Sequence, residues 1–346
     1  MIQNKYIKYA IILVSILIPI VTFYFWQIFY TSNLNVKGKR DFYLLIPTKS
    51  ANFETVVDSL EANKMVHDVM YFRFLSKLLK YPEHVKPGRY KIKPNAGNYE
   101  VIKALRSGNQ TAVKLTFNNV RLKQELVEKV AGKFEFDSTE FKRMLNDPEV
   151  AKFYGFTPET IVGMFLPNTY DVYWNTTPQK LLGRMKSEYD KFWTAERKAK
   201  AKALNLTQDE VITLASIVEA ETKKKDEKPR VAGVYLNHLA ANEPLRADPT
   251  VIFAIGDFGI KRLLHNQLLY QSPYNTYINK GLPPGPINIP ESSSIDAVLN
   301  REKHDYMYFC ASPKLNGYHI FAVTYQEHLK NAKDYQEALN QLGIKK

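Results

Sequence analysis

The sequence predicts an α+β protein that carries a long apolar helix near its N-terminus. Residues 9–30 form a run of 22 residues without a formal charge. Segments with strand-like alternation and segments with helical spacing both follow this run. The 346 residues exceed the usual size of a single domain, so two folded domains are expected after the apolar run.

The apolar run is predicted to be a transmembrane helix. At about 1.5 Å rise per residue, residues 9–30 are long enough to cross roughly 30 Å of hydrocarbon. A cleaved signal peptide is the alternative, but the run is longer than the usual apolar core of about 7–15 residues and ends in aromatic instead of small residues. Basic residues on both sides leave the orientation undecided, namely Lys5 and Lys8 before the run and Lys37, Lys39 and Arg40 after it.

Composition narrows the possible functions without fixing one. The formal net charge is +13, which is compatible with nucleic acid, an anionic membrane surface or an acidic polymer as partner. A generally basic, soluble surface explains the same net charge. Cys310 is the one cysteine, so an intramolecular disulfide and a Cys-x-x-Cys metal site are excluded.

Residues 41–114 are predicted to form a small α+β unit. Strand-like segments are expected at 41–47, 88–94 and 111–117, and helices at 53–64, 70–81 and 98–109. Asn52 is a candidate N-cap, and Gly108 marks the end of the third helix. The acidic residues of this unit are scattered on solvent-facing positions, so binding or spacing is a better interpretation than catalysis.

Residues 115–205 are predicted to be mainly helical. Helical patterns cover 120–134 and 141–155, and a long helix opens at Thr177-Pro178. The segment 162–174, GMFLPNTYDVYW with its preceding valine, is interpreted as an aromatic-rich turn. A structural role in the core explains it as well as a functional one.

The next helix carries two acids at its end. Thr207 and Glu210 form a T-x-x-E capping box before an apolar run, which predicts a helix from Thr207 to about Thr222. At about 100° per residue, Glu219 and Glu221 lie about 200° apart, so they do not form a side-by-side pair. Glu219 continues an apolar face, and burial there should raise its pKa, as a general acid near neutral pH requires. The alternative is that both acids are simply solvated at the helix end.

The C-terminal third combines a helix, loops and a hairpin. After a helix at 229–240 come a loop-rich run at 245–256 and an irregular stretch at 272–290 with five prolines and two glycines between residues 273 and 290. Tyr274, Asn275, Tyr277 and Asn279 lie on this stretch, and such side chains often line sugar sites. A structural Ω-loop without a ligand is the alternative. Residues 305–324 are predicted to form a β-hairpin before a last helix capped by Thr324 and Glu327. His319 and His328 lack metal-ligand spacing, which favours structural roles.

Several of these segments together resemble one known family. The order ASIVEAET, VAGVYLNHL, LRADPTVIFAIG, SPYNTYINKGLPPGPI and YMYF followed by GYHIFAVTYQEH is similar to the endolytic murein transglycosylases, the MltG or YceG-like proteins. The GMFLPNTYDVYW segment, the PGRY and ALRSGN unit and the apolar run fit as well. The resemblance therefore covers nearly the whole chain.

The resemblance implies a single-pass protein of the plasma membrane with an extracytoplasmic body. It implies a cytoplasmic tail (1–8), a transmembrane helix (9–30), a linker (31–40), a LysM-like module (41–114) and a catalytic domain (115–346) with a lytic-transglycosylase-type cleft. The implied activity is lytic cleavage of the β-1,4 bond between N-acetylmuramic acid and N-acetylglucosamine in nascent peptidoglycan glycan strands. The products have 1,6-anhydro ends, and strand elongation stops. Peptidoglycan synthases and the elongation machinery are expected as partners, without a metal or organic cofactor.

The resemblance also implies roles for individual residues. The first acid of the SIVE-x-E motif is Glu219, which is expected to be the catalytic acid and base. Asp248, Asn275 and Tyr277 match positions that shape the cleft, and Glu221 is expected to be a neighbour of the substrate. The family usually has P-D-T-Y in the aromatic segment, whereas this chain has Pro167-Asn168-Thr169-Tyr170, so an auxiliary acid is missing there.

Two other function classes remain open at this point. A membrane-anchored scaffold without activity would hold glycan through its basic body and release no anhydro product. A membrane protein that binds nucleic acid would need a concentrated basic element or a known binding motif. The sequence offers neither of these, so no nucleic acid is expected as a partner.

Overall fold

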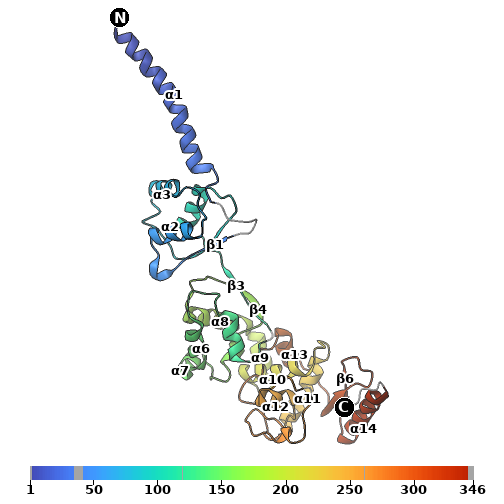
Figure 1. Cartoon of the computed structure of the whole chain (residues 1–346). Coiled ribbons are helices and arrows are strands. Elements are labelled where there is room, and N and C mark those ends of the chain that lie inside the picture. Colours follow the sequence, from blue (N-terminus) through green and yellow to red (C-terminus); the bar gives the residue numbers. More distant parts are fainter. Residues whose placement is uncertain (1, 35–41, 119, 261, 342–346) are drawn as a thin grey trace. The chain divides into compact units, whose positions relative to one another are not determined.

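The computed structural model of the chain describes residues 2–34, 42–118, 120–260 and 262–341 (Figure 1). It confirms the mixed α and β composition, with an N-terminal apolar helix and small sheets. The named strands of the described residues form two-stranded sheets, in the pairs β1 with β2, β3 with β4 and β5 with β6. The chain divides into two compact units: unit 1 comprises Met1–Lys114, Gly132–Phe136 and Asp171–Thr177, and unit 2 comprises Leu115–Ala131, Asp137–Tyr170 and Pro178–Lys346.

Helix α1 (Ile2–Tyr30) contains the predicted transmembrane run. Within the described ranges it is the one helix that is long and apolar enough to cross a membrane. Its side chains at 5–26 are exposed, but Ile28 is buried in unit 1. Leu34, inside the predicted linker 31–40, is also buried. Residues 35–40 of that linker lie outside the described residues, as do their basic side chains Lys37, Lys39 and Arg40.

Unit 1 confirms the predicted strands and helices of its sequence. β1 (Phe42–Ile46) pairs antiparallel with β2 (Gly88–Ile92), and the short η1 (Thr48–Ser50) and helices α2 (Phe53–Ala62) and α3 (Val69–Leu78) lie between them in the chain. α4 (Asn98–Ser107) follows. Asn52 caps α2 by accepting a hydrogen bond from the Thr55 amide, and Gly108 ends α4 at a φ of 75°. These local signals were sufficient because each one satisfies a free backbone group at a helix end.

The middle of the chain, residues 113–203, contains small helices and one strand pair. The elements are β3 (Val113–Phe117), α5 (Lys123–Val130), α6 (Ser138–Asn146), α7 (Pro148–Phe153), η2 (Ile161–Met164), β4 (Asn168–Val172), α8 (Pro178–Phe192) and α9 (Ala195–Ala203). The prediction of a plain turn at 162–174 was wrong, because residues 168–172 form β4 and pair with β3. Asn168 is exposed at the start of this strand.

The second part of unit 2 carries the helices that form the site. They are α10 (Gln208–Glu221), α11 (Lys228–Ala240), α12 (Asp248–Ile255) and α13 (Ser292–Leu299), with η3 (Gln267–Leu269) between the last two. The loop prediction at 245–256 was wrong for residues 248–255, where α12 forms. The described residues 272–290 contain no helix or strand, as predicted.

The C-terminal hairpin and helix match their predictions. β5 (Tyr308–Ala311) pairs antiparallel with β6 (His319–Ala322), with Tyr308 opposite Ala322. α14 (Tyr325–Gln341) begins after Thr324, whose hydroxyl accepts a hydrogen bond from the Glu327 amide while the Glu327 carboxylate accepts one from the Thr324 amide. α14 packs against both strands.

Candidate active site

Helix α10 places the two glutamates. The predicted capping box is present, since Thr207 and Glu210 each bond to the backbone of the other. All residues from 211 to 218 are buried, because α11, α12 and α13 pack against this helix. The helix ends at Glu221, and its last turn projects the two acids toward different neighbours.

Glu219 is held in an ion pair. The Lys228 ammonium donates to Glu219 Oε2 at 2.7 Å, and the Ser294 hydroxyl donates to the same oxygen. Lys228 is only 2% exposed, although its sequence context looked like a solvated charged stretch. Burial by itself would raise the pKa of Glu219, but the bonds from Lys228 and Ser294 outweigh it and lower the pKa below its usual value. The prediction of a raised pKa at Glu219 was therefore wrong.

Glu221 has the raised pKa that was expected of Glu219. Its Oε1 accepts a hydrogen bond of 2.6 Å from the hydroxyl of Tyr235, a buried residue of α11. Burial and the nearby Asp248 carboxylate raise the pKa of Glu221 to about 7, although the Tyr235 hydrogen bond opposes this shift. Such a group carries a proton for much of the time near neutral pH, as a general acid must.

Glu221 lines a cavity of about 440 Å³ in unit 2. The cavity is bordered by side chains from α10, α11, the start of α12, the loop after it, the β5–β6 hairpin and α14. A volume of this size is in the range of ligand-binding pockets. Its lining consists of Glu221, Val234, Tyr235, His238, Leu245, Arg246, Asp248, Tyr277, Met307, Tyr308, Phe309, Cys310, Ala311, His319, Tyr325 and His328.

Asp248 and Tyr277 meet at one edge of this cavity. The Tyr277 hydroxyl donates to Asp248 Oδ1 at 2.5 Å. Burial, the Asp248 bond and its charge all raise the pKa of Tyr277, so the phenol stays protonated. The structure thus brings together Glu221, Asp248 and Tyr277, while Glu219 is not among the lining residues.

Asn275 lies beneath the cavity edge instead of facing into it. Its side chain is fully buried. The amide nitrogen donates to the carbonyl oxygens of Leu268 and Tyr270, and the amide oxygen accepts from the Tyr277 backbone. Because these bonds use the side chain locally, Asn275 holds the loop that carries Tyr277.

His319 reaches the cavity from the hairpin, a position that its sequence context did not indicate. Its Nδ1 lies 2.8 Å from the Glu227 carboxylate, and its backbone amide donates to the same carboxylate at 2.7 Å. Glu227 is 3% exposed and also accepts a bond from the Thr222 hydroxyl. This buried carboxylate therefore ties the hairpin to the segment that follows Glu221. Tyr235 was missed for a similar reason, since its partner lies on another helix.

Similarity to known proteins assigns the chain to a family. The profile of the YceG-like family matches residues 46–334, which includes all five predicted site residues. The chain belongs to the YceG-like family. That match extends over both compact units, so the family assignment concerns the cavity and the N-terminal unit alike.

Curated relatives carry a common name. The endolytic murein transglycosylase of Bacillus subtilis (strain 168) is 39% identical over 144 residues, which cover 42% of this chain and 39% of that protein. The endolytic murein transglycosylase of Streptococcus pneumoniae serotype 2 (strain D39 / NCTC 7466) is 27% identical over 317 residues, covering 83% of this chain and 57% of that protein. The chain thus spans less than two thirds of the length of either relative.

A solved structure has the same fold. The crystal structure of a YceG-like protein from Listeria monocytogenes superposes with a TM-score of 0.55 at 26% sequence identity. The match covers 85% of this chain and 99% of that one. The fold described above is therefore similar to that of this solved YceG-like protein.

Proposed function

We propose that the protein is an endolytic lytic transglycosylase of peptidoglycan. It cleaves the β-1,4 bond between N-acetylmuramic acid and N-acetylglucosamine in nascent glycan strands and leaves 1,6-anhydro ends, which stops their elongation. The names of the relatives support this proposal. The observation that carries it is Glu221, a carboxyl group with a pKa of about 7 at a cavity lined with aromatic and polar side chains.

The proposed reaction uses one carboxyl group twice. Protonated Glu221 gives its proton to the glycosidic oxygen as the bond from that oxygen to the anomeric carbon breaks. The resulting carboxylate then takes the proton of the muramic acid 6-hydroxyl, whose oxygen bonds to the anomeric carbon. Proton loss and gain balance at Glu221, and no water is consumed. Because the nucleophile belongs to the substrate, a high effective concentration replaces the second carboxylate of a hydrolase.

The neighbours of Glu221 have supporting roles in this proposal. The Tyr235 hydroxyl fixes one carboxyl oxygen, which leaves the other to exchange the proton. Asp248 favours the protonated form of Glu221 by its charge and offsets positive charge at the anomeric carbon. Tyr277, held by Asp248, contacts the substrate and orients its N-acetyl group.

This proposal moves the catalytic role from Glu219 to Glu221. The family motif contains both acids, and the sequence assigned the reaction to the first. Glu219 is bonded to a buried ammonium that favours its ionised form, so it has no proton to donate near neutral pH. We assign Glu219 to the stability of the helix packing between α10, α11 and α13.

The test is mass analysis of products from uncrosslinked glycan. Lytic cleavage gives fragments that lack one water relative to hydrolysis products, and we expect these with the full chain. Fragments that retain that water would identify a hydrolase and overturn the proposal. Glycan that binds but stays intact would support the scaffold without activity instead.

The organisation of the chain is proposed on the same basis. We propose that residues 9–30 anchor the protein in the plasma membrane, with 1–8 in the cytoplasm and the catalytic domain 115–346 outside. Residues 41–114 are proposed to be a LysM-like module, which the order of β1, α2, α3 and β2 supports. Peptidoglycan synthases and the elongation machinery are proposed as partners because the substrate is their product.

A further inference from the structure

The last turn of α1 belongs to the core of unit 1 and not to its exposed apolar surface. Ile28 is 5% exposed and packs with the core residues of the unit. Its carbonyl oxygen accepts a hydrogen bond from the buried Asn98 side chain at the start of α4. The uncharged stretch that remains free for lipid is therefore 9–26. At about 1.5 Å per residue this is about 27 Å long, close to the thickness of a hydrocarbon core.

Helix α3 contacts α1 at the end of this free stretch. The Tyr71 hydroxyl bonds to the Tyr24 hydroxyl at 3.0 Å, and the rings of Phe74 and Phe25 meet edge to face at 6.3 Å. Figure 1 shows α3 at the end of the unit from which α1 projects. If the bilayer surrounds 9–26, its interface lies at the level of α3.

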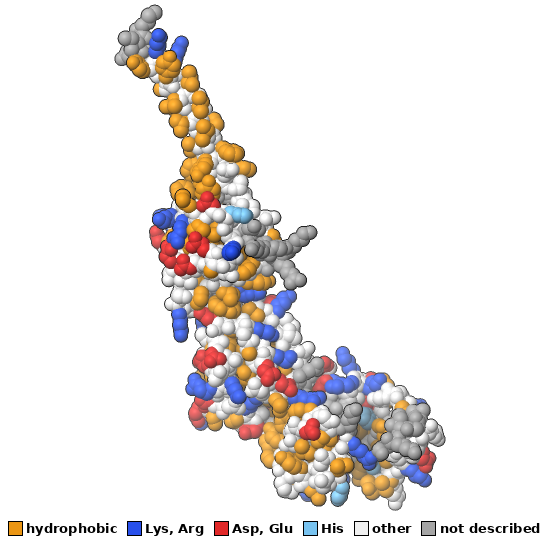
Figure 2. Space-filling model, viewed as in Figure 1, with side chains coloured by type: hydrophobic (Ala, Val, Ile, Leu, Met, Phe, Trp, Pro, Cys, Tyr) orange, Lys and Arg blue, Asp and Glu red, His pale blue; other side chains and the backbone are white. Residues whose placement is uncertain are grey.

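The exposed side of α3 is largely apolar, with Lys77 as its exposed charge. Met70, Phe74 and Leu78 are 76%, 45% and 55% exposed, and their spacing of four residues places them in one stripe along the helix. Figure 2 shows hydrophobic side chains along α1 that continue onto the adjoining end of unit 1. Such a stripe is unfavourable in water but suits the boundary between headgroups and acyl chains.

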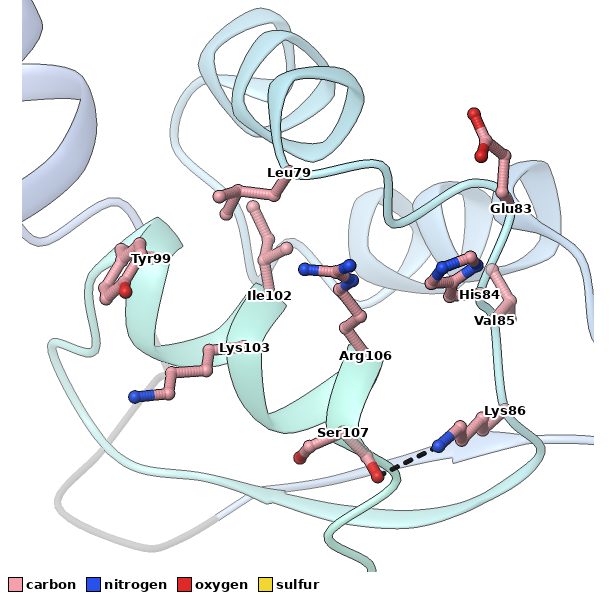
Figure 3. A pocket seen from close by; sticks show the side chains of 10 residues that line it. All are labelled: Leu79, Glu83, His84, Val85, Lys86, Tyr99, Ile102, Lys103, Arg106 and Ser107. Atoms are coloured by element: carbon pink, nitrogen blue, oxygen red, sulfur yellow. Dashed lines mark hydrogen bonds between the residues drawn. The ribbon is translucent and has the colours of Figure 1, made fainter.

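A basic cavity opens beside the C-terminal end of this stripe. It has a volume of about 700 Å³ and lies between α4 and the segment that follows α3 (Figure 3). Leu79 and Ile102 form an apolar part of the wall. Its charged lining consists of Lys86, Lys103 and Arg106 with the single carboxylate of Glu83.

The cations of this cavity are available to a ligand. Arg106 points into the open space in Figure 3, and its guanidinium forms no hydrogen bond or ion pair within the described part of the chain. Lys86 donates to the Ser107 carbonyl oxygen at 3.1 Å and has further donors free. Tyr99 at the other side of the cavity stacks on Phe29 of α1, so the cavity adjoins the same helix end as α3.

We propose that this face of unit 1 binds the surface of an anionic bilayer. The stripe of Met70, Phe74 and Leu78 inserts at the interface, and the basic cavity holds the phosphate of an anionic phospholipid headgroup. The proposal rests on the proposed membrane anchor. A lipid is the occupant that fits, because apolar insertion and phosphate binding occur side by side at the depth where the anchor leaves the bilayer. Guanidinium and ammonium groups are the donors that bind phosphate oxygens in proteins.

Insertion can be measured on the full chain in proteoliposomes. With Cys310 replaced by serine, single cysteines at Leu78, Leu45 and Leu17 would each carry an environment-sensitive fluorophore. Leu45 lies on β1 with 41% exposure and is the matched apolar control, and Leu17 lies within the anchor. We expect quenching by spin-labelled phosphatidylcholine at Leu17→Cys and Leu78→Cys but not at Leu45→Cys.

The outcomes separate this proposal from the anchor on which it rests. Absence of quenching at Leu17→Cys would overturn the anchor. Quenching at Leu17→Cys together with equal, weak quenching at Leu78→Cys and Leu45→Cys would overturn the surface proposal alone. Unit 1 would then make no contact with the lipid.

The preference for an anionic headgroup is tested in a second experiment. When phosphatidylglycerol carries the spin label instead, it should quench the fluorophore at Leu78→Cys more strongly than spin-labelled phosphatidylcholine does. Each of Lys103→Gln and Arg106→Gln should reduce this enrichment about fivefold or less, given the usual contribution of one basic residue near an anionic surface. Lys49→Gln, on η1, should leave it unchanged. Equal quenching by both lipids would contradict a lipid headgroup site.

Discussion

Two glutamates separated by one residue acquire opposite protonation behaviour from their neighbours. The buried ammonium of Lys228 lowers the pKa of Glu219. Burial and the repelling Asp248 carboxylate raise the pKa of Glu221 against the hydrogen bond from Tyr235. The difference arises from what the neighbouring elements bring to each face of α10. A carboxylate that is neutralised by an ion pair contributes to packing. A carboxyl group that retains its proton is suited to acid catalysis.

The pH dependence of activity should follow Glu221. The group must be protonated to donate, so kcat/KM should fall about tenfold per pH unit above a pKa of about 7. This profile is measured on uncrosslinked glycan with the full chain. The residual activity of Glu221→Gln should lack this alkaline limb. An unchanged limb in that variant would show that another group titrates.

The same pKa has a consequence for stability. The carboxyl of Glu221 has a folded pKa above its usual value of 4.5, so the folded state binds more protons than the unfolded state between these values. Its contribution to the free energy of unfolding therefore falls as pH rises from about 4.5 through about 7. Glu219 acts in the opposite direction: its lowered pKa stabilises the fold above the usual value, and this stabilisation is lost as pH falls.

At the scale of elements, predictions were correct where the signal is local. The caps at Asn52, Thr207 and Thr324 were read from the sequence because each satisfies backbone groups within three or four residues. β4 was missed because its partner β3 lies some fifty residues earlier in the chain. α12 was missed because Ala247 offers no side-chain cap and the residues after Asp248 are apolar without a period.

The site could be predicted only in part for the same reason. The sequence identified Glu219, Glu221, Asp248, Asn275 and Tyr277, but the choice between the two glutamates depends on α11 and α13. Lys228 looked like one of several solvated lysines until its helix placed it against Glu219. Tertiary contacts of this kind leave no periodic trace in the sequence.

The loop after α12 should depend on Asn275. Asn275→Ala removes three hydrogen bonds from a buried position, so we expect a cost of about 1–3 kcal/mol in unfolding free energy and a loss of activity. Tyr277→Phe removes the hydroxyl that bonds to Asp248 and should lower activity with a nearly unchanged thermal midpoint. The control is Asn266→Ala, at an exposed asparagine whose side chain has no bond within the described residues.

Thermal unfolding and activity of the three variants check this prediction. Full activity of Asn275→Ala would show that the loop does not position Tyr277. An equal loss in Asn266→Ala would show instead that the whole loop is sensitive to truncation of any side chain.

At the scale of the whole molecule, the N-terminal apolar helix α1 also stabilises unit 1. Ile28→Ala should lower the unfolding free energy of that unit by about 2–4 kcal/mol, because the side chain fills its core. Tyr30→Ala, at a residue that is 67% exposed, should have a much smaller effect. Hydrogen exchange of α4 amides in the full chain measures the difference. Equal exchange in both variants would mean that α1 does not contribute to the core.

The central claim is that Glu221, and not Glu219, exchanges the proton. The most direct measurement is the rate of anhydro-product formation from uncrosslinked glycan by Glu221→Gln and Glu219→Gln, each with verified folding. Glutamine at 219 still offers Lys228 an acceptor oxygen, so this variant is the matched control. We expect Glu221→Gln to lose about 10²- to 10⁴-fold in rate and Glu219→Gln to stay within about tenfold of the parent protein. Wild-type rates in Glu221→Gln, with the loss confined to Glu219→Gln, would contradict the account.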